Sequence, residues 1–272
     1  MIIDNKNCWE RIRETQLFLL DLDGTVYLEN ELIPGVKKFT QYLNRFHIPY
    51  VFITNNSSHS AKEYINKISK LGISITIDNI LTSGQASGLY LSKVRQCAKL
   101  FVVGTQALKD ELSGFGHHIC ENSEESVDYI VVGFDTELTY DKLKTACALI
   151  DKGAGFIATN PDLVCPIKDK RYLPDCGSIY TMIENATGKR AIIIGKPNST
   201  IVDIAKERFG LSIDKISIIG DRLYTDIALG SNNAIFTFCV LSGESTIDDI
   251  RNSPWKPDQV ISSIDFLNGA FE

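Results

Sequence analysis

Leu17-Phe-Leu-Leu-Asp-Leu-Asp-Gly-Thr-Val26 is the stretch of sequence on which the interpretation of this chain depends. The apolar run from Leu17 to Leu22 predicts a buried strand, because a short continuous hydrophobic run fits a strand that is covered on both faces. Asp21 and Asp23 lie two residues apart around the end of this strand, and Gly24 allows the backbone to turn sharply there. Both carboxylates can therefore project into one cleft.

Similar apolar runs recur along the chain and alternate with stretches that carry apolar residues at helical spacing. Strand and helix in alternation predict an α/β fold with a parallel, doubly wound, Rossmann-like sheet. The predicted strands are 17–22, 50–54, 100–103, 129–133, 155–159, 191–195, 216–220 and 234–240, and the predicted helices include 35–46, 61–71, 140–152, 178–186 and 199–209.

Polar residues that end an apolar run mark the candidate site, because ligands of such sheets bind beyond the carboxyl ends of the strands. Four runs end in this way, and all four lie outside the middle of the chain. We therefore expect a discontinuous catalytic core of residues 1–81 and 191–272, with residues 82–190 inserted as a smaller α/β cap domain. The four ends are Asp21 to Thr25, Thr54-Asn55-Asn56, Gly195-Lys196-Pro197, and Gly220-Asp221 with Asp226 following.

The paired carboxylates of Asp21 and Asp23 would raise each other's pKa unless a cation neutralised them. A hard divalent ion with oxygen ligands supplies that charge, and Asp221, at the end of another strand, completes the set. Magnesium fits best, because it keeps several waters and is commonly shared between carboxylates and a substrate phosphate. The sequence therefore predicts Mg²⁺ as the cofactor.

The remaining strand ends carry the donors that phosphoryl transfer requires around the transferring oxygens. Thr54 offers a hydroxyl, Asn55 a backbone N–H beside the start of a helix, and Lys196 a compact positive charge. Asp21 would attack phosphorus, while Asp23 would protonate the leaving oxygen and then activate water.

Composition narrows the choice of partner. With 34 acidic against 28 basic residues, a net charge of −6 and no run of Lys or Arg, the chain lacks the electrostatic footprint of a nucleic-acid-binding protein. Its seven scattered cysteines contain no C-x-x-C, which argues against disulfides or zinc and favours a reducing, cytoplasmic setting. No apolar run approaches the ~18 residues of a membrane span. We expect a small phosphorylated metabolite as partner, no nucleic acid and no membrane, and a homo-oligomer is left open.

Four motifs of the chain resemble those of the haloacid dehalogenase superfamily. They are Asp-Leu-Asp-Gly-Thr-Val at 21–26, Ile-Thr-Asn-Asn at 53–56, Gly-Lys-Pro at 195–197 and Gly-Asp-Arg-x-x-Thr-Asp at 220–226. Their order and spacing agree with that superfamily, and the resemblance covers residues 15–270. One such motif alone could be an ordinary strand-end turn, but four in order, each ending a predicted strand, favour the catalytic interpretation.

Within that superfamily the chain resembles the branch of NagD-type and p-nitrophenyl phosphatases, whose C2-type cap lies between the second and third motifs. Ala158-Thr-Asn-Pro-Asp162 and Pro174-Asp-Cys-Gly-Ser178 resemble parts of that cap. Two positions depart from the branch: it commonly has Pro-Gly-x-Gly at 174–177, and some relatives place His near Cys165. We predict that the cap, and Cys165 or its neighbours in particular, tunes substrate choice.

The resemblance implies hydrolysis through an aspartyl-phosphate, with Asp21 as nucleophile and Asp23 as general acid and base. It also implies that Asp21, the backbone carbonyl of Asp23 and Asp221 bind Mg²⁺ directly. Asp226 would contact these ligands and not the metal itself. The substrate phosphate would be bound by Thr54, Asn55, Asn56 and Lys196.

Other functions stay open at this point. A dehalogenase or phosphomutase of the same superfamily is one, although a carbon–halogen substrate has no leaving oxygen for Asp23 to protonate. A catalytically idle sensor of phosphorylated ligands is another, although every expected catalytic group is present. The substrate itself is undetermined among sugar phosphates, nucleotides and pyridoxal phosphate.

His117 and His118 follow Gly114 and Gly116 in a polar stretch that contains no second cluster of metal ligands. We predict both histidines as exposed loop residues outside the site.

Overall fold

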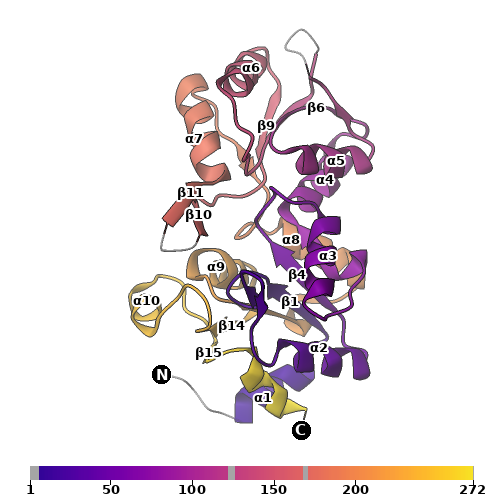
Figure 1. Ribbon diagram of the computed structural model, residues 1–272, viewed down its shortest axis with the longest axis vertical. Helices are drawn as coiled ribbons and strands as arrows, with labels where there is room; N and C mark the ends of the chain where they lie inside the picture. Colours follow the sequence, from indigo (N-terminus) through magenta and orange to yellow (C-terminus); the bar gives the residue numbers. More distant parts are fainter. Residues whose placement is uncertain (1–5, 122–125, 168–170, 272) are drawn as a thin grey trace. The chain divides into compact units, whose positions relative to one another are not determined.

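The computed structural model describes residues 6–121, 126–167 and 171–271, and its helices and strands are drawn in Figure 1. The chain divides into two compact units. The first comprises the described residues up to Thr54, then Tyr64–Leu81, and those from Lys196 onward, whereas the second comprises Asn55–Glu63 and Thr82–Gly195.

The first unit is built on a parallel sheet with the strand order β15-β14-β13-β1-β4-β5. Its central strands are buried along their whole length, as expected for a parallel sheet with both faces covered. The strands are β1 (Leu17–Asp21), β4 (Tyr50–Thr54), β5 (Ile80–Thr82), β13 (Ile216–Gly220), β14 (Phe236–Val240) and β15 (Gln259–Ile261).

Amphipathic helices cover this sheet. Phe39 of α2 packs edge-on against Phe18 of β1, with ring centroids 5.4 Å apart, and both side chains are fully buried. The helices are α1 (Lys6–Glu14), α2 (Val36–Arg45), α8 (Thr200–Phe209), α9 (Ala228–Asn233) and α10 (Ile247–Asn252), with α3 (Ala61–Lys70) running from the second unit into the first. A short hairpin of β2 (Tyr27–Leu28) and β3 (Glu31–Leu32) follows β1.

The second unit has its own parallel sheet, with the strand order β12-β9-β8-β6-β7. The strands are β6 (Lys99–Val103), β7 (His118–Ile119), β8 (Tyr129–Val132), β9 (Gly155–Ala158) and β12 (Ile192–Ile193). The helices are α4 (Ser83–Val94), α5 (Gln106–Gly114), α6 (Tyr140–Asp151) and α7 (Cys176–Thr187), and an antiparallel hairpin of β10 (Val164–Ile167) and β11 (Arg171–Pro174) precedes α7.

Two boundaries differ from those expected from the sequence. The predicted strand 191–195 was assigned to the core, but its regular part, β12, pairs with β9 in the second sheet. Residues 55–63 also group with the second unit, where the Asn55 side-chain amide donates a 2.7 Å hydrogen bond to Asp162. Neither the pairing partner of a strand nor the partner of a polar side chain is visible in residue spacing.

The prediction for His117 was wrong. Its side chain is buried, Nδ1 accepts from the Ala98 N–H at 3.2 Å, and Nε2 lies 3.1 Å from the Gly88 carbonyl oxygen. His118 belongs to β7, which pairs with β6. The flanking glycines suggested a loop, but pairing with the neighbouring strand determined the local structure.

Asn160 lies at the centre of a buried hydrogen-bond network in the second unit. Its amide donates to Asp162 and Asp175 at 3.0 and 3.2 Å, and its carbonyl oxygen accepts from Thr159 Oγ1 at 2.8 Å. All four side chains are at most 5% exposed. Buried carboxylates need such donors, because a buried acceptor without one carries its full desolvation cost.

Asn160→Ala is therefore expected to lower the free energy of unfolding by about 2 kcal/mol, because it leaves two buried carboxylates short of a donor. Urea unfolding followed by circular dichroism measures the change. Asn252→Ala is the matched control, because it removes an exposed amide that donates to a single backbone carbonyl. A loss no larger than that of the control would contradict the role given to Asn160.

No helix among the described residues is long and apolar enough to cross a membrane.

Candidate active site

The candidate site lies at the carboxyl edge of the first sheet. Asp21 is the last residue of β1 and pairs in register with Ile53 of β4, while Leu20 pairs with Ile219 of β13. Asp21 is therefore level with Gly220, and Asp221 follows one residue further along the adjacent parallel strand. Thr54, the last residue of β4, lies at the same edge and is buried.

Three buried carboxylates meet at this edge. Asp21, Asp221 and Asp226 each offer an oxygen within 4.8 Å of the others. Asp226 is brought there by a π-helical turn, Leu223–Ile227, that follows β13. Gly220 makes room for it, because a Cβ at this position would collide with the Asp226 side chain.

Lys196 is buried between two of these carboxylates. Its Nζ lies 2.5 Å from Asp21 Oδ1 and 2.6 Å from Asp226 Oδ1. Burial alone would lower the pKa of Lys196, but the charges of Asp21 and Asp226 raise it above its ordinary value. Lys196 is therefore a permanent cation within the carboxylate cluster.

The cluster still carries an excess of negative charge, since Lys196 offsets only one of three carboxylates. Burial, and then the charge of Asp21, raises the pKa of Asp226 to about 6 and raises that of Asp221 as well. Asp221 Oδ2 accepts a 2.6 Å hydrogen bond from the Glu244 N–H, whereas its Oδ1 is buried and finds no hydrogen-bond partner in the described part of the chain. An all-oxygen ligand set with an unsatisfied buried carboxylate oxygen fits a hard divalent cation.

Asp23 follows Asp21 by two residues, in the turn after β1, and is exposed. The turn depends on Gly24, which has a φ of +86° and whose N–H donates to the Tyr27 carbonyl at 2.9 Å. A Cβ at Gly24 would also meet the Asp221 carboxylate. No other residue type would allow this chain path without displacing Asp221.

Tyr27 and Lys67, which sequence reasoning did not single out, lie beside Asp23. Lys67 Nζ is 3.7 Å from the centroid of the Tyr27 ring. Burial raises the pKa of Tyr27, and the charge of Asp23 raises it further. Burial lowers the pKa of Lys67, with Asp23 acting in the opposite direction. Neither residue ends a predicted strand, which is the feature that identified the other site residues.

Asn55 and Asn56 group with the second unit, whereas Asp21, Asp221, Asp226 and Lys196 group with the first. The Asn55 side chain is hydrogen-bonded to Asp162, and Asn56 Oδ1 accepts from the N–H and hydroxyl of Ser58. Their binding of phosphate stays a prediction.

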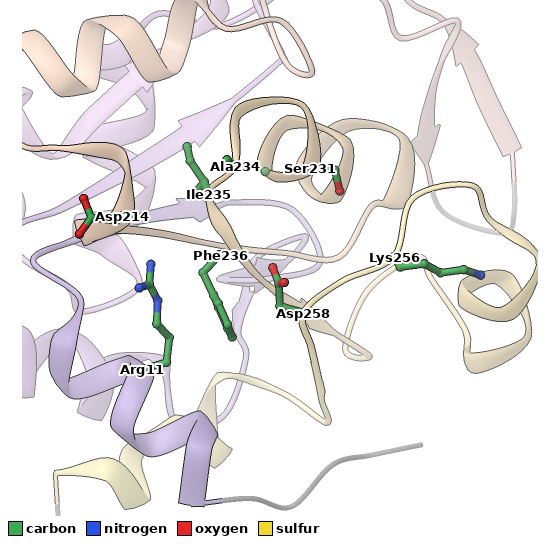
Figure 2. Close-up of a pocket in the computed structure, with 9 residues that line it drawn as sticks. Arg11, Asp214, Ser231, Ala234, Ile235, Phe236, Lys256 and Asp258 are labelled. Atoms are coloured by element: carbon green, nitrogen blue, oxygen red, sulfur yellow. The ribbon is translucent and has the colours of Figure 1, made fainter.

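A pocket of about 370 Å³ opens at the opposite, amino-terminal edge of the same sheet (Figure 2). The guanidinium carbon of Arg11, on α1, lies 5.0 Å from the centroid of the Phe236 ring, and the same guanidinium donates to the Ile216 carbonyl. Phe236 and Ile216 are the first residues of β14 and β13, so Arg11 is fixed at the amino-terminal ends of these strands. The pocket is lined by residues outside the predicted site: Arg11, Asp214, Gly230, Ser231, Ala234, Ile235, Phe236, Lys256 and Asp258.

Two parts of the chain match protein families. Residues 18–118 match the family described as haloacid dehalogenase-like hydrolase, and residues 193–267 match the one described as HAD-hydrolase-like. The matched parts include β4, β13 and all of β1 except Leu17, and these strands carry the site.

Similar proteins span almost the whole chain. The acid sugar phosphatase of Staphylococcus epidermidis is 35% identical over 246 residues, which are 90% of this chain and 94% of that protein. The structure of 4-nitrophenylphosphatase from Thermotoga maritima superposes with a TM-score of 0.91 at 39% identity, covering 96% of this chain and 99% of the other. That of glycerol phosphate phosphatase from Mycobacterium tuberculosis, in complex with magnesium, has a TM-score of 0.86 at 28% identity and covers 94% and 77%.

Proposed function

This chain belongs to the haloacid dehalogenase-like hydrolases, and on that premise we propose that it is a magnesium-dependent phosphatase of small phosphate monoesters, acting through an aspartyl-phosphate on Asp21. The observation that carries the proposal is the cluster of Asp21, Asp221 and Asp226 around buried Lys196 at the carboxyl edge of a parallel sheet. A nucleophilic carboxylate, a permanent cation and a divalent-metal ligand set are the groups that phosphoryl transfer requires.

In the first step, an Asp21 oxygen forms a bond to phosphorus while the bond to the leaving oxygen breaks, and Asp23 gives that oxygen its proton. In the second, Asp23 takes a proton from water, the water oxygen bonds to phosphorus, and the Asp21–phosphorus bond breaks. Lys196 orients Asp21 through the 2.5 Å contact. Mg²⁺ held by Asp21, the Asp23 carbonyl and Asp221, with Asp226 behind them, would supply the charge that neutralises the phosphate oxygens.

Trapping the intermediate tests this proposal. Purified enzyme is mixed with Mg²⁺ and p-nitrophenyl phosphate, and phosphate release is measured. Sodium borohydride added during turnover should reduce an acyl phosphate at position 21 to homoserine, which peptide mass spectrometry detects. Phosphate release without modification of Asp21 would reject the covalent mechanism, and no release at all would favour the idle sensor of phosphorylated ligands.

We assign the chemistry to the first unit as a discontinuous core and substrate selection to the second unit as its cap. The names of the relatives, acid sugar phosphatase and glycerol phosphate phosphatase, favour a phosphorylated polyol or sugar as the substrate class. Ranking kcat/KM over a panel of sugar phosphates, glycerol phosphate, nucleotides and pyridoxal phosphate tests this class.

Cys165 gives a prediction for the cap. It lies on β10 of the hairpin in the second unit and is partly exposed, whereas the groups proposed to do the chemistry belong to the first unit. Cys165→Ser is expected to change the kcat/KM ratio between two metabolite substrates by about tenfold, the scale of one contact in a pocket. The rate on p-nitrophenyl phosphate should change less. Cys97→Ser, at another thiol of the second unit, is the control, and a uniform slowing of all substrates by Cys165→Ser would contradict a role in specificity.

A further inference from the structure

The segment Ser242-Gly243-Glu244, which follows β14, contacts Asp221 directly. We name it the Asp221 clamp. The Glu244 N–H donates to Asp221 Oδ2 at 2.6 Å, and Ser242 Oγ donates to the Gly24 carbonyl at 2.8 Å. Gly243 passes so close that a Cβ there would collide with the Asp221 carboxylate. The clamp therefore determines which way this carboxylate faces.

An ion pair fixes the clamp. Arg222 Nε lies 3.0 Å from Glu244 Oε2, and the Tyr224 hydroxyl lies 3.3 Å from the same oxygen. Arg222 directly follows Asp221 in the chain, while Glu244 reaches Asp221 through its backbone N–H. Residues 221–222 and Glu244 are thus linked twice, once by the Arg222–Glu244 ion pair and once by the hydrogen bond from the Glu244 N–H to the Asp221 carboxylate.

We propose that Arg222 and Glu244 are positioning residues for metal binding: their ion pair holds the Glu244 amide on Asp221 Oδ2 and so leaves Oδ1 facing the cation. Asp221 Oδ1 is buried and has no hydrogen-bond partner among the described residues, as an oxygen kept for a metal would be. This inference rests on the proposed function, since it takes the cation to be the Mg²⁺ of the phosphatase.

Charge alone gives the opposite expectation for Arg222. Its guanidinium interacts with Asp21 and Asp221, so as a nearby positive charge it should repel Mg²⁺. If charge decided, Arg222→Gln would bind Mg²⁺ more tightly than the wild type. If positioning decides, Arg222→Gln binds it more weakly, because the clamp loses its anchor.

Isothermal titration calorimetry with MgCl₂, on the full chain without substrate, separates the two. Arg222→Gln and Glu244→Gln are each expected to weaken Mg²⁺ binding by about 10- to 100-fold, the usual effect of losing a residue that orients a metal ligand. The double variant Arg222→Glu/Glu244→Arg should recover most of that loss, because it restores the pair with its charges exchanged. Asp248→Asn, which breaks an exposed 2.9 Å ion pair with Arg251, is the control and should bind as the wild type does.

Binding by Arg222→Gln that equals or exceeds the wild type would overturn the inference. If that variant unfolds, the Glu244→Gln titration decides in its place, with wild-type affinity as the overturning result. A wild type that binds no Mg²⁺ would overturn the proposed metal site together with this inference. A wild type that binds it, with both variants unchanged, would overturn the inference alone.

Discussion

Asp21→Asn is expected to lower kcat by roughly 10⁴-fold or more, the scale seen when a catalytic nucleophile is removed. An amide is nearly isosteric with the carboxylate but is a far poorer nucleophile and metal ligand. The variant should stay folded. Asp21 is one of three carboxylates crowded within 4.8 Å, so a neutral side chain there relieves repulsion, and Lys196 keeps its 2.6 Å contact with Asp226.

The measurement is phosphate release from p-nitrophenyl phosphate, with circular dichroism and thermal unfolding to verify the fold. Asp214→Asn, an exposed carboxylate at the opposite edge of the sheet, is the control and should keep wild-type activity. A folded Asp21→Asn enzyme with activity within tenfold of the wild type would count decisively against Asp21 as the nucleophile.

The parallel α/β fold could be predicted because its central strands are buried on both faces. Such strands are mostly apolar runs, as in Leu17–Asp21 and Ile216–Gly220, and polar residues stand at their carboxyl ends. The doubly wound fold with a cap, and the superfamily, are confirmed by the solved structures and by the family matches. Asp21, Asp221 and Asp226 were candidates because they lie at or just after the ends of such apolar runs, and the structure brings them together with Lys196.

Elements without a hydrophobic period were missed. Helix α4, Ser83–Val94, buries most of its first half, and many of its buried residues are small, such as Gly84 and Gly88. It therefore shows little amphipathic pattern. Strands β5 and β15 have three residues each, too few for a pattern to stand out. Their place in the sheet depends on neighbours that are distant in sequence.

The contacts that orient the site were also invisible. Glu244 binds Asp221 through its backbone N–H, a group that every residue except proline carries, so residue type gives no signal. Tyr27 and Lys67 come from separate segments, and only the fold brings the ammonium group to 3.7 Å from the ring. Sequence could predict which chemical groups are present, but not which neighbours hold them.

Removal of the metal is expected to abolish activity, because the charge of the site demands a cation. Asp21, Asp221 and Asp226 are buried together with one lysine, and the substrate phosphate adds a charge of roughly −1.5 to −2. In excess chelator, phosphate release should therefore fall by at least about 100-fold, as a site without its metal loses its main source of charge neutralisation. Mg²⁺ should restore it. Ca²⁺ should restore it poorly, because a larger ion with longer bonds disturbs the in-line approach of Asp21 to phosphorus.

Asp221→Ala tests the same metal site by removing one of its proposed ligands. It removes the buried Oδ1, which has no hydrogen-bond partner within residues 6–121, 126–167 and 171–271, so the Mg²⁺ concentration for half-maximal activity should rise by at least about tenfold while the maximum falls. Asp258→Ala, at the other edge of the sheet, should leave that concentration unchanged. Chelator treatment must leave the circular dichroism spectrum intact, so that loss of activity reports on the metal and not on unfolding. Full activity after dialysis against chelator would refute the metal assignment. Three buried carboxylates and one lysine would then bind a phosphate dianion without a divalent cation, although the repulsion between these negative charges requires one.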